Sequence, residues 1–274
     1  MQAESTRPQA DTRTITVIGQ RLHVAIRPGK GIRTPLLLMN GVGVRLEVLH
    51  PFVDVLDPAI EVIRFDVPGV GNSPPPVIPY SFSTLAYLVT KMLDQLGYKQ
   101  VDVLGVSWGG GLAQQFAFQH GKRCRRLVLT STGTGTIMIP GYPSVLSKMA
   151  MPQHYTDPSY LEEIAADIYG GDLRSTPEFM HELAQDMRLD EPQGYFYQVM
   201  AAMGWTSLPW LKFLRQPTLI LAGDDDPLIP PVNARMMRFL ILHSRLHIYH
   251  GGHLGLLTHA QELARVIEQF LAAR

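Results

Sequence analysis

The chain has 274 residues, of which 46% are hydrophobic and 18% are charged, enough for one large domain with a sizeable core. Its 24 basic side chains equal its 24 acidic side chains, and a net charge of zero gives no electrostatic reason to expect nucleic acid or an anionic membrane as a partner. We predict neither a secretory signal nor a transmembrane segment, because no stretch reaches the ~18 apolar residues of a span. The single cysteine excludes an internal disulfide framework, which favours a cytoplasmic protein.

Short apolar runs alternate with amphipathic stretches along most of the chain. A hairpin is predicted over 14–26, and buried strands over 35–40, 60–66, 101–106, 125–131, 217–223 and 245–250. Helices are predicted from about 46, over 82–98, over 108–119, after the aspartates at 224–226 and over 254–274. Strand–helix alternation with nearly continuous apolar strands predicts an α/β fold. We expect a mostly parallel eight-stranded sheet with an antiparallel edge and helices on both faces.

One segment interrupts this alternation. Between about 135 and 212 the chain is rich in Met, Pro, Tyr and Trp, and helices are predicted over 160–171 and 177–189 without a clear strand. We interpret 12–134 and 213–274 as two parts of one core, and 135–212 as a helical lid inserted between them.

The stretch Gly105-Val106-Ser107-Trp108-Gly109 fits the pattern G-x-S-x-G, after a predicted strand and before a predicted helix. This context is typical of a nucleophile elbow, in which a strained turn projects the serine hydroxyl from the sheet edge. The alternative is a glycine-rich turn whose serine only caps the helix. A phosphate-binding loop is excluded because no Gly-Lys-Ser/Thr follows.

A serine nucleophile needs a histidine base, and this fold class places the histidine last in the chain. His253 follows Gly251-Gly252 just beyond the last predicted strand, at the sheet edge expected for Ser107. We therefore predict His253 as the base. His250 is the alternative, unless it is a surface histidine at the strand end.

The acid that orients the base should follow the preceding strand. Three aspartates stand there, and Asp226 is favoured because it lies at the loop apex, while Asp224 and Asp225 remain alternatives or serve to cap the next helix. Asp66 also follows a strand, but its position in the chain is wrong for the triad. We interpret it as a carboxylate that stabilises a turn.

An oxyanion hole requires two backbone N–H groups. Trp108, directly after the candidate nucleophile, should supply one, and Val42, between Gly41 and Gly43, the other. Glycines there would let the backbone approach a substrate carbonyl. Candidate substrate-binding residues are Asn40, Gly41, Gly43 and Trp205.

These motifs together resemble a known family. The segments "NGVG", "FDVPGVG", "GVSWGG", "GWTS" and "GDDDPLIP" look like the α/β-hydrolase superfamily and, more closely, the intracellular medium-chain-length polyhydroxyalkanoate depolymerases of bacteria. The resemblance runs from about 15 to 272. It implies Ser107 as nucleophile, Asp226 as acid and His253 as base, in a hydrolysis of polyester bonds that requires no metal and no organic cofactor.

Other functions share the same triad. A small-ester esterase or a carbon–carbon bond hydrolase for soluble substrates is the alternative, and a non-catalytic receptor is disfavoured by the apparently complete triad. A dehalogenase is disfavoured because residue 107 is serine rather than aspartate. The sequence does not determine the oligomeric state.

Apolar residues in the predicted lid suit an aliphatic substrate, unless they only pack within the fold. They are Met149, Met151, Tyr169, Met200, Met203, Trp205 and Trp210. The resemblance also implies that part of the outer face of the lid contacts the surface of a polyhydroxyalkanoate granule.

Overall fold

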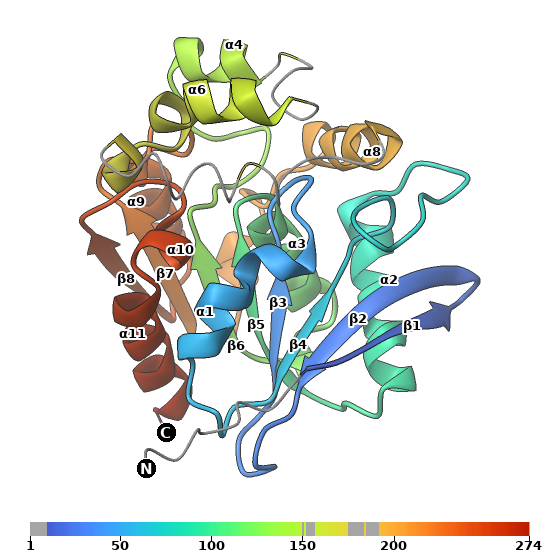
Figure 1. Cartoon of the computed structure of the whole chain (residues 1–274). Helices are drawn as coiled ribbons and strands as arrows, with labels where there is room; N and C mark the ends of the chain where they lie inside the picture. Colours follow the sequence, from blue (N-terminus) through green and yellow to red (C-terminus); the bar gives the residue numbers. More distant parts are fainter. Residues whose placement is uncertain (1–9, 150, 152–156, 175–183, 185–191, 274) are drawn as a thin grey trace, which may run out of the picture.

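The computed structural model describes residues 10–149, 151, 157–174, 184 and 192–273. Its centre is an eight-stranded sheet between two layers of helices, which confirms the predicted fold class (Figure 1). The strand order is β1-β2-β4-β3-β5-β6-β7-β8; β2 runs antiparallel to β1 and β4, and the remaining pairs are parallel. The strands are β1 (Asp11–Val17), β2 (Gln20–Arg27), β3 (Leu36–Met39), β4 (Val62–Phe65), β5 (Val101–Val106), β6 (Cys124–Thr130), β7 (Thr218–Gly223) and β8 (Ser244–Tyr249).

The central strands are buried in nearly every position and are mostly apolar because both faces of the sheet are covered; Arg64 of β4 and Asp102 of β5 are buried exceptions. Along β3, Leu37 and Met39 belong to one hydrophobic core, and Leu36 and Leu38 belong to the other. The first core packs under α2 (Phe82–Gln95), α3 (Trp108–Gln119) and α9 (Pro231–Leu240). The second packs under α1 (His50–Val55), α10 (Gly255–Thr258) and α11 (Ala260–Ala272). Short 3-10 turns are η1 (Leu46–Leu49), η2 (Gly121–Arg123), η3 (Gly171–Arg174) and η4 (Leu211–Phe213).

The closing helix differs from its prediction. The sequence pattern predicts one helix over 254–274, but the structure has α10 and α11, separated at His259, whose φ of −122° and ψ of 34° are not helical. The His259 ring lies 5.8 Å from the ring of Tyr249 and pairs with Asp172 at 3.2 Å. These contacts link His259 to β8 and to η3, and local periodicity does not register contacts outside the helix.

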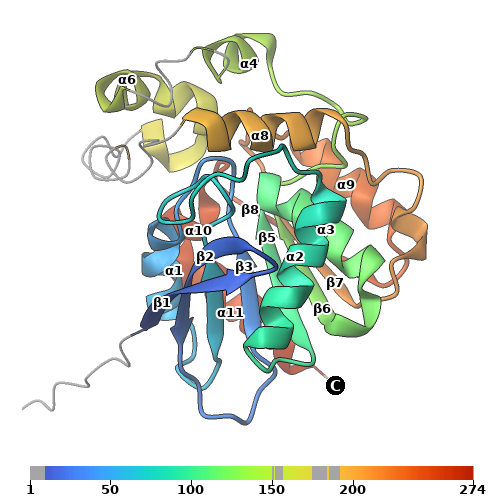
Figure 2. The same cartoon turned by 90° about the vertical axis from the view of Figure 1, so that its right-hand side faces the viewer.

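Among the described residues, three helices lie beyond the carboxyl ends of the parallel strands: α4 (Pro143–Met149), α6 (Pro158–Tyr169) and α8 (Pro192–Met203) (Figures 1 and 2). They belong to the segment that follows β6 and precedes β7, where we predict a lid. The helices α4 and α6 contribute to a small third core around Leu161, Ile164 and Ile168. The helix predicted over 177–189 lies outside the described residues except for Ala184. Within the described parts of the chain, no helix is both long and apolar enough to cross a lipid bilayer.

Candidate active site

The turn between β5 and α3 has the strained geometry that the serine motif predicts. Ser107 has a φ of 52° and a ψ of −119°, in a region that residues other than glycine rarely occupy. Its N–H donates to the carbonyl of Thr130 at 2.9 Å, and its own carbonyl accepts from Gly110 N–H at 2.9 Å and Thr132 Oγ1 at 2.7 Å. These bonds on both sides of the peptide unit hold the backbone in this conformation.

Glycines allow the helix to start this close to the sheet. A Cβ atom on Gly109 would overlap the carbonyl oxygens of Met39 and Asn40 at the end of β3, and one on Gly105 would overlap Gly109 and Ala113 in α3. Small residues on both sides of the turn therefore bring the N-terminus of α3 against the carboxyl ends of β3 and β5. Trp108 is the first residue of α3, so its N–H belongs to the first turn, whose donors a helix leaves unpaired.

A buried Asp–His pair lies at the carboxyl ends of β7 and β8. His253 Nδ1 is 2.8 Å from Asp226 Oδ2, and the two side chains are 3% and 0% exposed. The other carboxylate oxygen accepts from the backbone N–H groups of Leu228 at 3.0 Å and Ile229 at 2.8 Å, which fixes the orientation of Asp226. An ionised carboxylate only accepts hydrogen bonds, so Nδ1 carries the proton and Nε2 is left with a lone pair.

The alternative acid and base residues have other partners. His250 has a 92% exposed side chain and pairs with Asp224 at 2.9 Å. This hydrogen bond raises the pKa of His250 above its ordinary value and lowers the pKa of Asp224. Asp225 Oδ2 accepts from the N–H of Gly171 at 2.9 Å. Among the three aspartates, the one that contacts a buried histidine is therefore Asp226.

Asp66 stabilises turns, as we predict from its place in the sequence. Its fully buried carboxylate accepts from Leu46 N–H at 2.8 Å and Asn72 N–H at 2.9 Å, and it lies 2.9 Å from His23 Nδ1. Burial raises the pKa of Asp66, and these hydrogen bonds oppose that shift.

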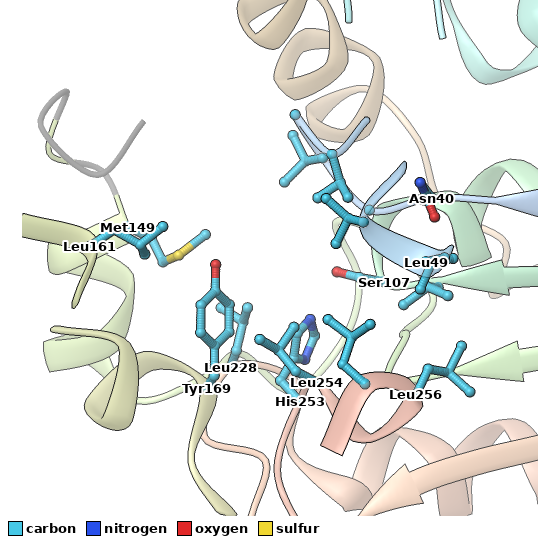
Figure 3. A pocket seen from close by; sticks show the side chains of 17 residues that line it. Asn40, Leu49, Ser107, Met149, Leu161, Tyr169, Leu228, His253, Leu254 and Leu256 are labelled. Carbon is cyan, nitrogen blue, oxygen red and sulfur yellow. The ribbon is translucent and has the colours of Figure 1, made fainter. Parts of the chain in front are cut away.

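Ser107 and His253 both border one apolar cavity, which we call the first cavity. Figure 3 shows the serine oxygen and the imidazole ring directed into it. Residues 40–43, the predicted oxyanion loop, form part of its wall. The remaining wall is aliphatic apart from Tyr169, and consists of Val44, Val48, Leu49, Val106, Met149, Leu161, Leu228, Leu254, Leu256 and Leu257.

Ser107 also borders a second cavity, on the side of Trp108 and Trp205. The predicted substrate-binding residues are thereby divided. Asn40, Gly41 and Gly43 line the first cavity, whereas Trp205 lines the second. The other apolar residues predicted in the lid also divide. Met149 and Tyr169 line the first cavity, and Met203 lines the second. Met151 and Met200 are exposed, and the ring of Trp210 stacks on the ring of Phe118 at 4.4 Å.

Sequence reasoning missed two contacts from the helices above the sheet. Gln198 of α8 is fully buried; its Oε1 accepts from Gly43 N–H at 2.7 Å, and its carbonyl accepts from Trp108 Nε1 at 2.8 Å. Tyr169 of α6 accepts from His253 N–H at 2.7 Å through its carbonyl, and its ring stacks on the His253 ring at 6.0 Å. For Gln198, the sequence contains one indication of a buried polar contact: it is the lone glutamine in the otherwise apolar run 195–203.

The described residues hold no group of three or more His, Cys, Asp or Glu side chains that could bind a metal ion. The groups that the structure brings together are a strained serine, a buried Asp–His pair and the backbone N–H groups at the start of a helix. Such a set suits nucleophilic attack on an acyl carbon.

This sheet, elbow and Asp–His pair define the α/β-hydrolase class. The family model described as the alpha/beta hydrolase fold matches residues 34–260, and the chain belongs to this family. It is similar to a poly(3-hydroxyalkanoate) depolymerase of Ectopseudomonas oleovorans, with 50% identity over 259 residues that cover 94% of this chain and 92% of the relative. This match confirms the resemblance predicted from the motifs, and the chain is a carboxylic ester hydrolase.

More distant relatives share the fold with other activities. A 3-oxoadipate enol-lactonase of Acinetobacter baylyi is 24% identical and covers 88% of this chain and 89% of its own. The crystal structure of a hydrolase from Pseudomonas aeruginosa superimposes with a TM-score of 0.82 at 21% identity, over 96% of this chain and 99% of the other.

Proposed function

We propose that this chain hydrolyses the ester bonds of medium-chain-length poly(3-hydroxyalkanoate). The observation that carries the proposal is the 50% identity, over 94% of the chain, with a poly(3-hydroxyalkanoate) depolymerase. The aliphatic wall of the first cavity supports the medium chain length, because it offers a monomer side chain apolar contacts and few polar groups.

In the proposed first step, Ser107 Oγ attacks the ester carbonyl carbon while His253 Nε2 accepts the hydroxyl proton. The carbonyl oxygen becomes an oxyanion that the N–H groups of Val42 and Trp108 stabilise, and loss of one such donor costs roughly 10²–10³ in rate. Asp226 holds the imidazole and stabilises its cation. The ester C–O bond then breaks, and the departing alkoxide of the neighbouring monomer takes the proton from His253.

The second step releases the 3-hydroxyacyl group that is bound to Ser107. His253 accepts a proton from water, and the resulting hydroxide attacks the acyl carbon. The tetrahedral intermediate collapses, the serine oxygen regains the proton, and a 3-hydroxy acid or an oligomer with a new carboxylate leaves. Both steps use side chains and backbone N–H groups of this chain together with water.

We also propose that α4 and α6 act as a lid. Met149 of α4 and Leu161 and Tyr169 of α6 line the first cavity, so these helices cover a bound acyl chain. Excluding water there would strengthen the interactions that stabilise the oxyanion. Tyr169 would couple the lid to His253, because it touches both the cavity and the histidine.

A hydrolase for soluble substrates is the alternative function, since a 2-hydroxymuconate semialdehyde hydrolase of Pseudomonas putida is 29% identical over 77% of this chain. The experiment compares clearing of a medium-chain polyester suspension with clearing of a short-chain polyester and with hydrolysis of 4-nitrophenyl acetate. We expect clearing of the medium-chain suspension. If the protein cleaves only the small ester, the depolymerase proposal fails.

A further part of the proposal concerns the granule surface. Large apolar side chains are exposed around the helices above the sheet: Ile137, Ile139, Met203 and Phe196 are 54%, 52%, 69% and 59% exposed. The loop 66–81 runs beside α8 in Figure 2 and adds Val77 and Ile78, at 94% and 73%. A contiguous apolar patch on a protein surface usually marks a binding site, and a water-insoluble polyester would cover these side chains.

Binding through these side chains should resist salt. We expect the protein to stay on isolated polyester granules through a wash in 1 M NaCl, which screens charge but not apolar contact. The double variant Val77→Asp/Ile78→Asp should wash off more readily than a Phe239→Asp control on α9. Release of the wild type by salt alone would point to a charged contact instead.

A further inference from the structure

The second cavity differs from the first in its walls. Its floor is an aromatic cluster in which the Phe82 ring lies 4.7 Å from Trp108 and 4.8 Å from Trp205. Besides Ser107, two hydroxyl residues line it, and both are already bonded: Thr132 donates to the Ser107 carbonyl, and Thr136 donates to the Trp205 carbonyl. The cavity thus offers an apolar surface and few polar groups to a ligand.

Both cavities include Ser107 in their lining, and α4 and the loop after Asp226 contribute to each of them. On α4, Leu146 faces the second cavity and Met149, one turn later, faces the first. After Asp226, Leu228 faces the first cavity and Ile229 the second. One helix and one loop therefore each contribute a side chain to both cavities, and they lie between the two.

An ester has two substituents, the acyl part and the alcohol part. In a polyester both continue as chain, so an enzyme that cleaves an internal ester must accommodate a monomer on each side of the bond. We propose that the second cavity binds the monomer unit across the scissile ester from the unit held in the first cavity. This inference rests on the proposed polyester function for the identity of its ligand, an alkyl-bearing 3-hydroxyacyl unit.

The test separates the two sides of the ester with small substrates. Methyl octanoate has a long acyl part and a small alcohol, and octan-2-yl acetate has the reverse. Leu146→Trp narrows the second cavity and Met149→Trp narrows the first, with both changes on one helix. Met203→Trp is a second variant that narrows the second cavity. Met203 is 69% exposed, so the fold tolerates the larger side chain there. Phe239→Trp, 84% exposed on α9, is the control.

Because the first cavity is proposed to hold the acyl part, we expect Leu146→Trp and Met203→Trp to lower kcat/KM about tenfold for octan-2-yl acetate, and Met149→Trp to lower it about tenfold for methyl octanoate. Each variant should also slow cleavage of the 3-hydroxyoctanoate dimer, which has bulk on both sides. The proposal is overturned if the second-cavity variants that melt like the wild type affect neither ester, or affect the same ester as Met149→Trp. If this pattern appears but no polyester is cleaved, the polyester function fails and the division between cavities stands.

Discussion

His253→Ala is expected to lower kcat/KM for ester hydrolysis by roughly 10⁴-fold or more, because a serine hydroxyl without its base is a poor nucleophile. The kcat/KM of His250→Ala, three residues earlier, is expected to stay within about twofold of the wild-type value. Its side chain is exposed and lies away from the reacting atoms, so its loss removes no transition-state contact. Initial rates with 4-nitrophenyl octanoate at pH 8 measure both variants against the same wild-type preparation.

The exposed pair of His250 and Asp224 supplies a stability control with a defined pH dependence. Because the folded-state pKa of His250 is raised, its contribution is fully present below the unfolded value of about 6.5 and is lost as the pH rises through the folded value. The melting temperature of His250→Ala should therefore fall further below that of the wild type at pH 5.5 than at pH 9. Loss of activity in His250→Ala but not in His253→Ala would reverse the assignment of the base.

Gly109→Ala is expected to lower the free energy of unfolding by about 3 kcal/mol, because the new methyl group would overlap the backbone carbonyls of Met39 and Asn40. Neither β3 nor the first turn of α3 can yield easily, since both are part of the packed core. Urea denaturation followed by circular dichroism measures the change, and the variant should also lose activity because Ser107 and Trp108 would be displaced.

A matched glycine gives the control for this experiment. A Cβ on Gly204 would meet nothing closer than 3.9 Å, so Gly204→Ala should leave the free energy of unfolding nearly unchanged. If Gly109→Ala unfolds at the same urea concentration as Gly204→Ala, the close approach of α3 to β3 is not required for the elbow.

The sheet was predictable because its signals are local. Strands that are covered on both faces are mostly apolar, and β5 and α3 have the predicted bounds because the glycines around Ser107 mark the change of period. The periodicity does not reveal the break at His259, because its contacts are with Tyr249 of β8 and Asp172 of η3, which lie outside the closing helix.

The candidate site was predictable only in part. Chain order pointed to Asp226 and His253, which the structure pairs at 2.8 Å. The division of the space around Ser107 depends on how α4 and the loop after Asp226 lie over the sheet, and no local pattern contains that information. Trp205 therefore lines a different cavity from residues 40–43, although no sequence pattern separates them.

Product release from a medium-chain polyester suspension by the wild type and by Ser107→Ala, followed by mass spectrometry, tests whether the serine at the elbow cleaves the ester. We expect 3-hydroxy acids or their oligomers with the wild type, and release at least about 10³-fold slower with a Ser107→Ala protein that melts normally. Equal release by both proteins would contradict this expectation, because the ester would then be cleaved without the serine at the elbow.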